Sequence, residues 1–279
     1  MYVPSKIGLK NMVRNRKRLG VRFQLWLVLL VLLVANVHDS VAWGPQGHRV
    51  VGFIAESHLQ PKVKKLIFEK LNINSLADVA TWADEIRKKR EEEKSWHYTN
   101  IAEGQWTYDA ARDCPSGSCV TEQIQKFSDI LADPSAPLQQ RKDALKYLVH
   151  FVGDVHQPLH LGNKKDRGGG KTRLPYKGKV VSLHYLWDGG LIDWQGSLLK
   201  YATRLNARVL EGEISSWNLS TVSDWANESR SMALKSAYTV ENKSLSKAYI
   251  ERSREIIDLR LTQAGVRLAH LLNTILTIK

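Results

Sequence analysis

The sequence has few cysteines and no apolar run long enough to cross a membrane easily. Only two of its 279 residues are cysteine, too few for a multi-thiolate metal site or a disulfide-rich scaffold. The longest apolar run covers residues 23–37, which is shorter than the roughly 20 residues that a transmembrane helix needs. The sequence also lacks an internal repeat and a recognisable linker, so nothing in it indicates more than one domain.

The first 42 residues have the pattern of an export signal. Seven basic residues precede the apolar run, whose length suits the core of a signal peptide. Ser40 and Ala42 place small residues at the −3 and −1 positions of a cleavage site before Trp43. We therefore predict a signal peptide over residues 1–42, a single mature domain over residues 43–279, and a secreted or periplasmic protein without stable membrane association. An uncleaved membrane anchor is the alternative.

The charge is biased toward basic residues. The whole chain carries a formal net charge of +13, and the removal of residues 1–42 leaves +7. A charge of this size favours a polyanionic partner and is also ordinary for a secreted enzyme. A mature chain of this length can bury a full core as one domain.

The apolar periodicity is helical along nearly the whole mature chain, which predicts an all-α, single-domain protein of many helices. The expected loops cover residues 100–119 and 157–180, the second with a short hairpin around Tyr176–Lys179. A helical pattern resumes near Val181. The expected helices cover residues 50–59, a short segment from Pro61, and residues 75–86, 120–132, 140–156, 191–210, 221–238 and 245–275.

Cys114 and Cys119 are separated by four residues. In an exported protein this spacing favours a disulfide that closes a small surface loop. A zinc-binding pair is the weaker alternative, because four intervening residues are at the long end of the usual spacing of thiolate pairs in zinc sites.

Two His-x-x-x-Asp pairs are the strongest sign of chemistry. His150 and Asp154 are four residues apart and lie on one face of the expected helix, and His184 and Asp188 repeat that spacing. His160 lies between the pairs and follows a proline that should end the first helix. Imidazole nitrogen and carboxylate oxygen are the ligands that zinc takes outside thiolate sites, so these residues predict a metal site.

Other histidines have weaker local signals. His156 lies two residues past Asp154 and would face away from that carboxylate, so we expect it to be packed or to support a ligand. His58 and His270 have no acidic or imidazole partner at ligand spacing and are not expected to be ligands. Asp84 and His97 have no local evidence for a role.

Read together, five blocks in order along the mature chain resemble the S1/P1 nuclease family. The block from His150 to His160 is the most specific of them. The blocks are Trp43-Gly-Pro-Gln-Gly-His48, Thr81-Trp-Ala-Asp84, Trp96-His97-Tyr98, His150-Phe-Val-Gly-Asp154-Val-His-Gln-Pro-Leu-His160 and Leu183-His184-Tyr-Leu-Trp-Asp188.

The resemblance implies a phospholipase C/P1 nuclease-like helical fold with three zinc ions in a cleft. Its ligand sets, carried over position by position, are Asp84, His97, His150 and Asp154 for one zinc; the α-amino and carbonyl groups of Trp43, with His48 and Asp154, for the second; and His160, His184 and Asp188 for the third. The Trp43 amine can bind metal only if Trp43 is the N-terminus, so this ligand set depends on signal cleavage.

The resemblance further implies cleavage of the P–O3′ bond of single-stranded DNA and RNA by a monomeric enzyme. The products would carry 5′-phosphates, and 3′-nucleotides would also be substrates. Two zinc ions that share Asp154 would lower the pKa of a bound water from about 15.7 toward 7. Asp84, Asp154 and Arg87 are the candidate catalytic residues, and no protein nucleophile is needed.

The resemblance also suggests how the substrate is held. Arg87 lies one turn after Asp84 and would clamp the phosphate, or belongs to a solvated run of charges. Tyr98 would stack on an unpaired base, or belongs to the core. The loop of residues 164–179 has seven basic residues and one acid, and could attract a phosphate backbone. Gly170 stands where the family usually has an asparagine, so one amide contact to substrate is in doubt.

Two alternatives remain. A zinc phospholipase C shares the fold and an N-terminal Trp ligand, although its later helical pair ends in Glu where this chain has Asp188. A zinc-stabilised, non-catalytic nucleic-acid-binding protein is the other alternative. Its zinc sites would normally be closed and rich in thiolates, unlike the His/Asp pattern seen here.

Overall fold

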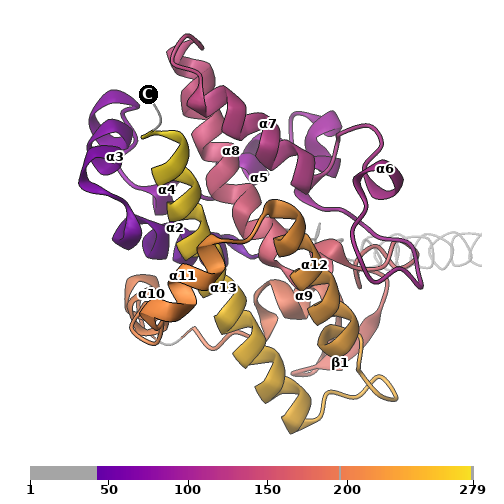
Figure 1. Ribbon diagram of the computed structural model, residues 1–279. Coiled ribbons are helices and arrows are strands. Elements are labelled where there is room, and N and C mark those ends of the chain that lie inside the picture. Colours follow the sequence, from indigo (N-terminus) through magenta and orange to yellow (C-terminus); the bar gives the residue numbers. More distant parts are fainter. Residues whose placement is uncertain (1–42, 195, 278–279) are drawn as a thin grey trace, which may run out of the picture. The chain divides into compact units, whose positions relative to one another are not determined.

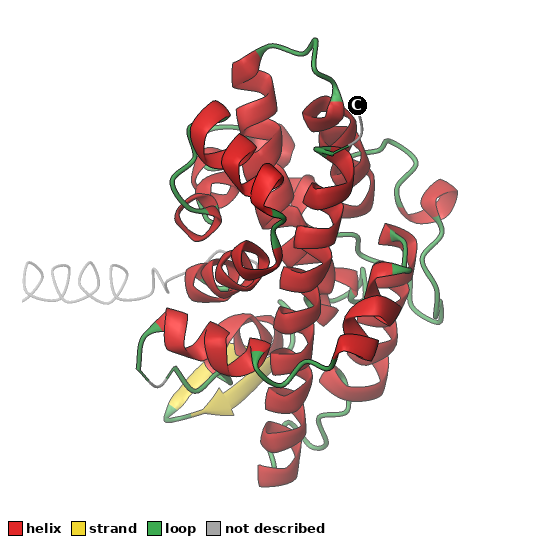
Figure 2. Ribbon diagram, turned by 60° about the vertical axis from the view of Figure 1, so that its left-hand side comes forward, coloured by secondary structure: helices red, strands yellow, loops and turns green. Residues whose placement is uncertain are grey.

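The computed structural model describes residues 43–194 and 196–277, so the predicted signal peptide lies outside the described residues. Helices dominate this part of the chain, with one small hairpin (Figures 1 and 2). The α-helices are α2 (Pro45–His58), α3 (Pro61–Lys65), α4 (Leu76–Val79), α5 (Trp82–Ile86), α6 (Ala110–Asp113), α7 (Val120–Ala132), α8 (Leu138–His156), α9 (Leu183–Tyr185), α10 (Leu198–Asn206), α11 (Glu211–Asn218), α12 (Val222–Met232) and α13 (Lys247–Ile275).

Short helical segments of other geometry connect several of these helices. Two are 3₁₀-helices and three have π-helical hydrogen bonding. They are η1 (Leu66–Lys70), η2 (Glu91–His97), η3 (Pro158–Leu161), η4 (Leu186–Gly190) and η5 (Ala233–Ala237). The all-α prediction is therefore confirmed.

Helix α8 is the central element of the core. Every residue from Ala144 to His156 except Lys146 is buried, because α7, α2, α12, α13 and α5 all pack against it. α7 contributes an amphipathic face to this packing, and α13 is the longest of the described helices (Figure 1). A helix buried on all sides is expected to be apolar all round, as this stretch is. A polar side chain here would need a ligand or a hydrogen-bond partner to offset the cost of its burial.

The hairpin consists of β1 (Arg173–Tyr176) and β2 (Lys179–Ser182), paired antiparallel. It confirms the turn expected around Tyr176–Lys179. The helix expected to resume near Val181 is wrong at that point, because Val181 pairs with Leu174 in the hairpin and the helix starts only at Leu183. Cross-strand packing of β-branched and apolar side chains outweighs the local helical pattern here.

Two other expected helices differ from the structure. Residues 191–194, 196 and 197 are not helical; α10 starts at Leu198, where the Ser197 side chain accepts a hydrogen bond from the Lys200 backbone N–H and caps the helix. The stretch over residues 75–86 is divided into α4 and α5 by a break at Ala80 and Thr81. This break leaves the Ala80 carbonyl free of the helical ladder and available to a side chain.

Candidate metal centre

Nine predicted site residues come from segments far apart in the sequence, and eight of them form three groups whose ligand atoms lie within 4.8 Å of one another. α2, α5, η2, α8, η3, α9 and η4 each supply at least one side chain. We call the groups the His48 cluster (His48, His150, Asp154), the Asp84 cluster (Asp84, His97, His150) and the His184 cluster (His160, His184, Asp188).

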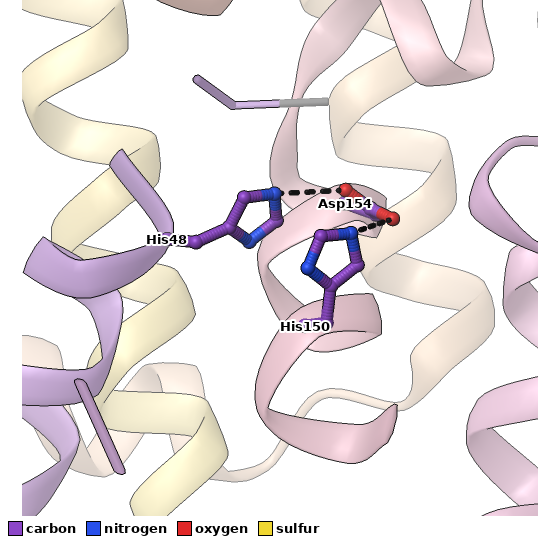
Figure 3. A group of neighbouring side chains, drawn as sticks. All are labelled: His48, His150 and Asp154. Atoms are coloured by element: carbon purple, nitrogen blue, oxygen red, sulfur yellow. Dashed lines mark ion pairs between the residues drawn. The ribbon is translucent and has the colours of Figure 1, made fainter. Parts of the chain in front are cut away.

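Asp154 links the first two clusters. Its Oδ1 lies 3.3 Å from His48 Nε2, and its Oδ2 lies 3.3 Å from His150 Nε2 and 3.1 Å from His97 Nδ1. Figure 3 shows the imidazoles of His48 and His150 pointing at this carboxylate, from α2 and α8 respectively. Asp154 is fully buried, so it presents both oxygens to ligand groups rather than to solvent.

Backbone carbonyls fix the orientation of three of these imidazoles. The Nδ1 atoms of His150, His160 and His184 lie 2.7, 2.6 and 2.6 Å from the carbonyl oxygens of Ala80, His97 and Gly168. An Nδ1–H that donates to a carbonyl leaves Nε2 as a lone-pair donor for a metal. The interruption between α4 and α5 thus frees the carbonyl that orients His150.

Asp188 is oriented by Gln157, a residue for which we predicted no role. The Gln157 side-chain amide is fully buried, donates to Asp188 Oδ1 and accepts from the Leu159 backbone N–H. Gln157 is therefore held at both ends, and Asp188 Oδ2 lies 3.4 Å from His184 Nε2. The position of Gln157 within the most specific sequence block was the one signal that could have identified it.

Burial controls the charge of the imidazoles. Desolvation lowers the pKa of His48, His97 and His184, and lowers that of His160 to about 3. These rings are neutral at neutral pH, which is the form that binds metal. His150 differs: burial would lower its pKa, but the carboxylates of Asp154 and Asp84 outweigh burial and raise it to about 9. A metal ion bound there would have to displace that proton.

Several buried polar atoms in these clusters have no hydrogen-bond partner within the described chain. They are both ring nitrogens of His48, both carboxylate oxygens of Asp84, Asp154 Oδ1 and His97 Nε2. A buried polar atom without a partner costs about 1–3 kcal/mol, and more if it is charged. A bound cation would satisfy these atoms. An ordinary protein core would not be expected to contain so many of them in one place.

Gly153 allows α8 to approach His48 closely. A Cβ at this position would lie 2.8 Å from His48 Nδ1. The His48 ring stacks on His150, with ring centroids 3.8 Å apart, so it has little room to move. Trp43 lies next to the same point: it is fully buried, and its indole N–H donates to the Gly153 carbonyl at 2.8 Å.

The predicted substrate contacts lie near the clusters. Arg87 Nε is 3.2 Å from Asp84 Oδ1, and the Arg87 side chain is 13% exposed, so it does not belong to a fully solvated run. Tyr98 is 38% exposed, which excludes the core alternative. Gly170 follows the buried Gly168 and Gly169 and is partly exposed.

The histidines expected not to be ligands take no part in the clusters. His156 Nε2 lies 3.0 Å from an Arg267 guanidinium nitrogen, and His156 Nδ1 lies 2.7 Å from the Val152 carbonyl oxygen. Because arginine can only donate, both ring nitrogens of His156 are occupied. His58 Nε2 lies 2.6 Å from Asn206 Oδ1, and His270 is exposed.

The structure also decides between the two alternatives for the cysteines. Cys114 and Cys119 form a disulfide, which excludes the zinc-pair alternative. None of the described helices combines the length and the apolar character that a membrane crossing requires.

The all-helical fold and the three His/Asp clusters together define a protein that could bind several metal ions. The family model of S1/P1 nuclease matches residues 43–277. The chain is 30% identical to Endonuclease 3 of Arabidopsis thaliana, over 94% of this chain and 98% of the relative. It is 30% identical to Nuclease S1 of Aspergillus oryzae, over 85% and 92%, and 27% identical to Nuclease P1 of Penicillium citrinum, over 84% and 97%.

The chain therefore belongs to the S1/P1 nuclease family, whose members are hydrolases. This membership confirms the resemblance drawn from the sequence and decides against the zinc phospholipase C alternative.

Proposed function

We propose that this protein is a zinc-dependent endonuclease that hydrolyses the P–O3′ bonds of single-stranded DNA and RNA, leaves 5′-phosphate ends, and also acts on 3′-nucleotides. The observation that carries the proposal is the set of three buried His/Asp clusters. Two of them share His150 and both contact Asp154, and these two contain imidazole and carboxylate atoms without a hydrogen-bond partner. The family membership and the names of the relatives support the same conclusion.

The donor set fits zinc. All the side-chain donors are imidazoles or carboxylates, and three of the five imidazoles are oriented by carbonyls in the manner usual for zinc sites. We propose three ions, held by Asp84, His97, His150 and Asp154; by His48, Asp154 and the Trp43 amine and carbonyl; and by His160, His184 and Asp188. Bound zinc would supply an activated water and neutralise charge on the phosphate.

The chain's own residues position and neutralise the substrate. Arg87 lies beside Asp84 and presents a guanidinium that can donate two hydrogen bonds to a phosphate. The exposed ring of Tyr98 directly follows His97 and can stack on an unpaired base. Stacking is available to every base, so it favours single strands with little sequence preference.

The basic segment, residues 164–179, extends the contact with the substrate strand. Its seven basic side chains are all exposed. The segment also touches the site, because the carbonyl of Gly168 contacts the ring of His184. We propose that these side chains attract phosphates on either side of the cleaved bond.

Export completes the site in this proposal. Removal of residues 1–42 would make Trp43 the N-terminus, and its free amine would become a ligand; the enzyme would then act outside the cytoplasm as a monomer. The contact of Trp43 with Gly153, the residue before Asp154, supports this role.

Native mass spectrometry of the secreted protein tests this proposal together with a nuclease assay. We expect a mass that begins at Trp43, three zinc ions per chain, and 5′-phosphate products from single-stranded DNA and RNA. Asp154→Asn keeps the shape but removes a shared ligand, and should lower activity by more than the roughly 10- to 100-fold typical of residues that only support ligands.

The control is the same protein with extra residues before Trp43, which should hold one zinc fewer and lose most of its activity. Full activity and three zinc ions in that extended form would refute the role of Trp43. A zinc-loaded wild type that binds single strands but never cleaves them would refute the catalytic proposal and support a binding protein.

A further inference from the structure

The loop between η3 and β1 has an unusual backbone. Arg167, Gly168 and Gly169 are three consecutive residues with positive φ, of 55°, 60° and 81°. Arginine rarely adopts this left-handed conformation, which costs of the order of 1 kcal/mol for a residue with a side chain. Such a conformation persists only where surrounding contacts enforce it, and it is often found where a site needs it.

Asp166 and Tyr238 supply those contacts. Asp166 Oδ1 accepts hydrogen bonds from the Gly169 N–H and the Tyr238 hydroxyl, both at 3.0 Å, and Asp166 Oδ2 accepts from the Thr172 hydroxyl at 2.9 Å. The Tyr238 hydroxyl also accepts from the Asn163 N–H at 2.9 Å. The two side chains therefore connect the beginning, middle and end of the loop. Burial raises the pKa of Tyr238, so its hydroxyl stays protonated and can donate.

The conformation of the loop places two carbonyls against His184. The Gly168 carbonyl oxygen lies 2.6 Å from His184 Nδ1, and the Gly169 carbonyl accepts from the His184 backbone N–H at 3.4 Å. There is no room for a side chain, since a Cβ on Gly168 would lie 2.3 Å from the Leu159 carbonyl oxygen. The loop thus decides which nitrogen of His184 carries the proton and which one faces Asp188.

We propose that Tyr238 and Asp166 are positioning residues for the His184 cluster. They hold the loop in its left-handed conformation, and the Gly168 carbonyl then keeps His184 in the tautomer that presents Nε2 to a metal ion. Tyr238 follows η5, an element that contributes no residue to the three clusters. The inference rests on the proposed function, because it assumes that the His184 cluster binds zinc.

Tyr238→Phe is the direct test, with Tyr108→Phe as the matched control. Tyr108 is also a half-buried tyrosine whose hydroxyl donates to a carboxylate, that of Glu122 at 2.9 Å, and it touches none of the three clusters. Zinc content is measured by native mass spectrometry across a chelator series. We expect Tyr238→Phe to lower the affinity for one of the three zinc ions by about 10- to 100-fold. Tyr108→Phe should lose zinc at the same chelator concentrations as wild type.

Two further variants separate positioning from general stability. Asp166→Ala should lower the affinity for the same zinc ion. Asp166→Asn can still accept hydrogen bonds from Gly169 and Tyr238, so it should keep much of the affinity that Asp166→Ala loses. In a His184→Ala background, where that ion is already lost, Tyr238→Phe should have no further effect on the two remaining ions.

The outcomes distinguish this inference from the proposed function. A wild type without zinc would contradict the proposed function itself. A wild type with three zinc ions and a Tyr238→Phe variant that binds all three equally well would overturn the inference alone. An equal loss of affinity for all three zinc ions in Tyr238→Phe would also overturn it, because the substitution would then affect the fold as a whole.

Discussion

At the scale of single residues, the clusters depend on how closely backbone and side chains approach one another. Asp154 can contact residues of two clusters because α8 presents its carboxylate at the point where α2 crosses it, and that crossing requires a glycine at position 153. His48 is confined between Gly153 and the ring of His150. A single methyl group added here should therefore disturb one cluster more than the others.

Gly153→Ala tests this residue. The new Cβ would lie 2.8 Å from His48 Nδ1, so the His48 ring must shift away from Asp154. We expect at least about a tenfold loss of affinity for the zinc ion proposed for the His48 cluster, measured by zinc content against chelator concentration, with the His184 cluster unaffected. Gly212→Ala on α11, where a Cβ meets nothing within 4 Å, is the control. Wild-type zinc affinity in Gly153→Ala would contradict the prediction.

At the scale of elements, the hairpin and the loop before it combine two properties. The loop supports His184 through backbone contacts, while the basic side chains of the hairpin point to solvent. Arg173, Lys177 and Lys179 are exposed and lie on β1, the turn and β2. They are outside the metal clusters, so their removal should affect long substrates without affecting the chemistry.

The triple substitution of Arg173, Lys177 and Lys179 by Gln tests this separation. Each phosphate contact on a single strand contributes about 0.7 to the slope of log affinity against log salt, so the slope for a long oligonucleotide should fall by about 2. Turnover of a 3′-mononucleotide should be unchanged.

The matched control for the hairpin variant lies on α3. Gln at Lys62, Lys64 and Lys65 removes the same charge from an exposed surface far from β1 (Figure 1). An equal change of slope in both triple variants would show that only net charge matters, and that the hairpin has no specific role.

At the scale of the whole molecule, a buried ionic network connects the C-terminal end of α8 to α12 and α13. Arg260 and Arg267 of α13 are buried and both pair with Glu228 of α12. Arg260 also donates to the His156 backbone carbonyl at 3.1 Å, and Arg267 contacts the His156 ring. The network thus supports the end of the helix that carries His150 and Asp154, and its loss should lower the stability of the domain.

Glu228→Gln should lower the free energy of unfolding at neutral pH by about 1–3 kcal/mol, less than for a fully buried pair because Glu228 is one-third exposed. Burial alone would raise the pKa of Glu228, but the hydrogen bond and charges of Arg267 and Arg260 outweigh it and hold the pKa below its usual value. The stabilisation is therefore complete above about pH 4.5 and is lost as the pH falls through the lowered pKa.

Denaturant unfolding of wild type and Glu228→Gln across the acid range measures this difference. The two curves should converge at low pH. Glu69→Gln removes an exposed partner of Lys65 and should change stability by no more than about 0.5 kcal/mol. A difference in unfolding free energy between wild type and Glu228→Gln that does not shrink as the pH falls would contradict the assignment of the charge to this network.

Much of the site could be predicted from the sequence because ligand spacing on a helix is a local property. His150 and Asp154 are one turn apart on α8, and His184 and Asp188 are one turn apart across α9 and η4. The helical class followed in the same way from periodicity. Asp84 and His97 had no local signal, and only the resemblance to a family connected them with the other ligands.

Tertiary structure decided what depends on contacts between distant segments. The pairing of Val181 with Leu174, the Gln157 contact with Asp188 and the support of His184 by the loop at Asp166 each join residues that have no helical spacing to reveal them. Local sequence determined which side chains could be ligands. The packing of α2, α5, α8 and the loop between η3 and β1 determined which of these side chains lie close together. The physical reason is that helical spacing acts over one turn, while burial and hydrogen bonding act between any segments that the fold brings together.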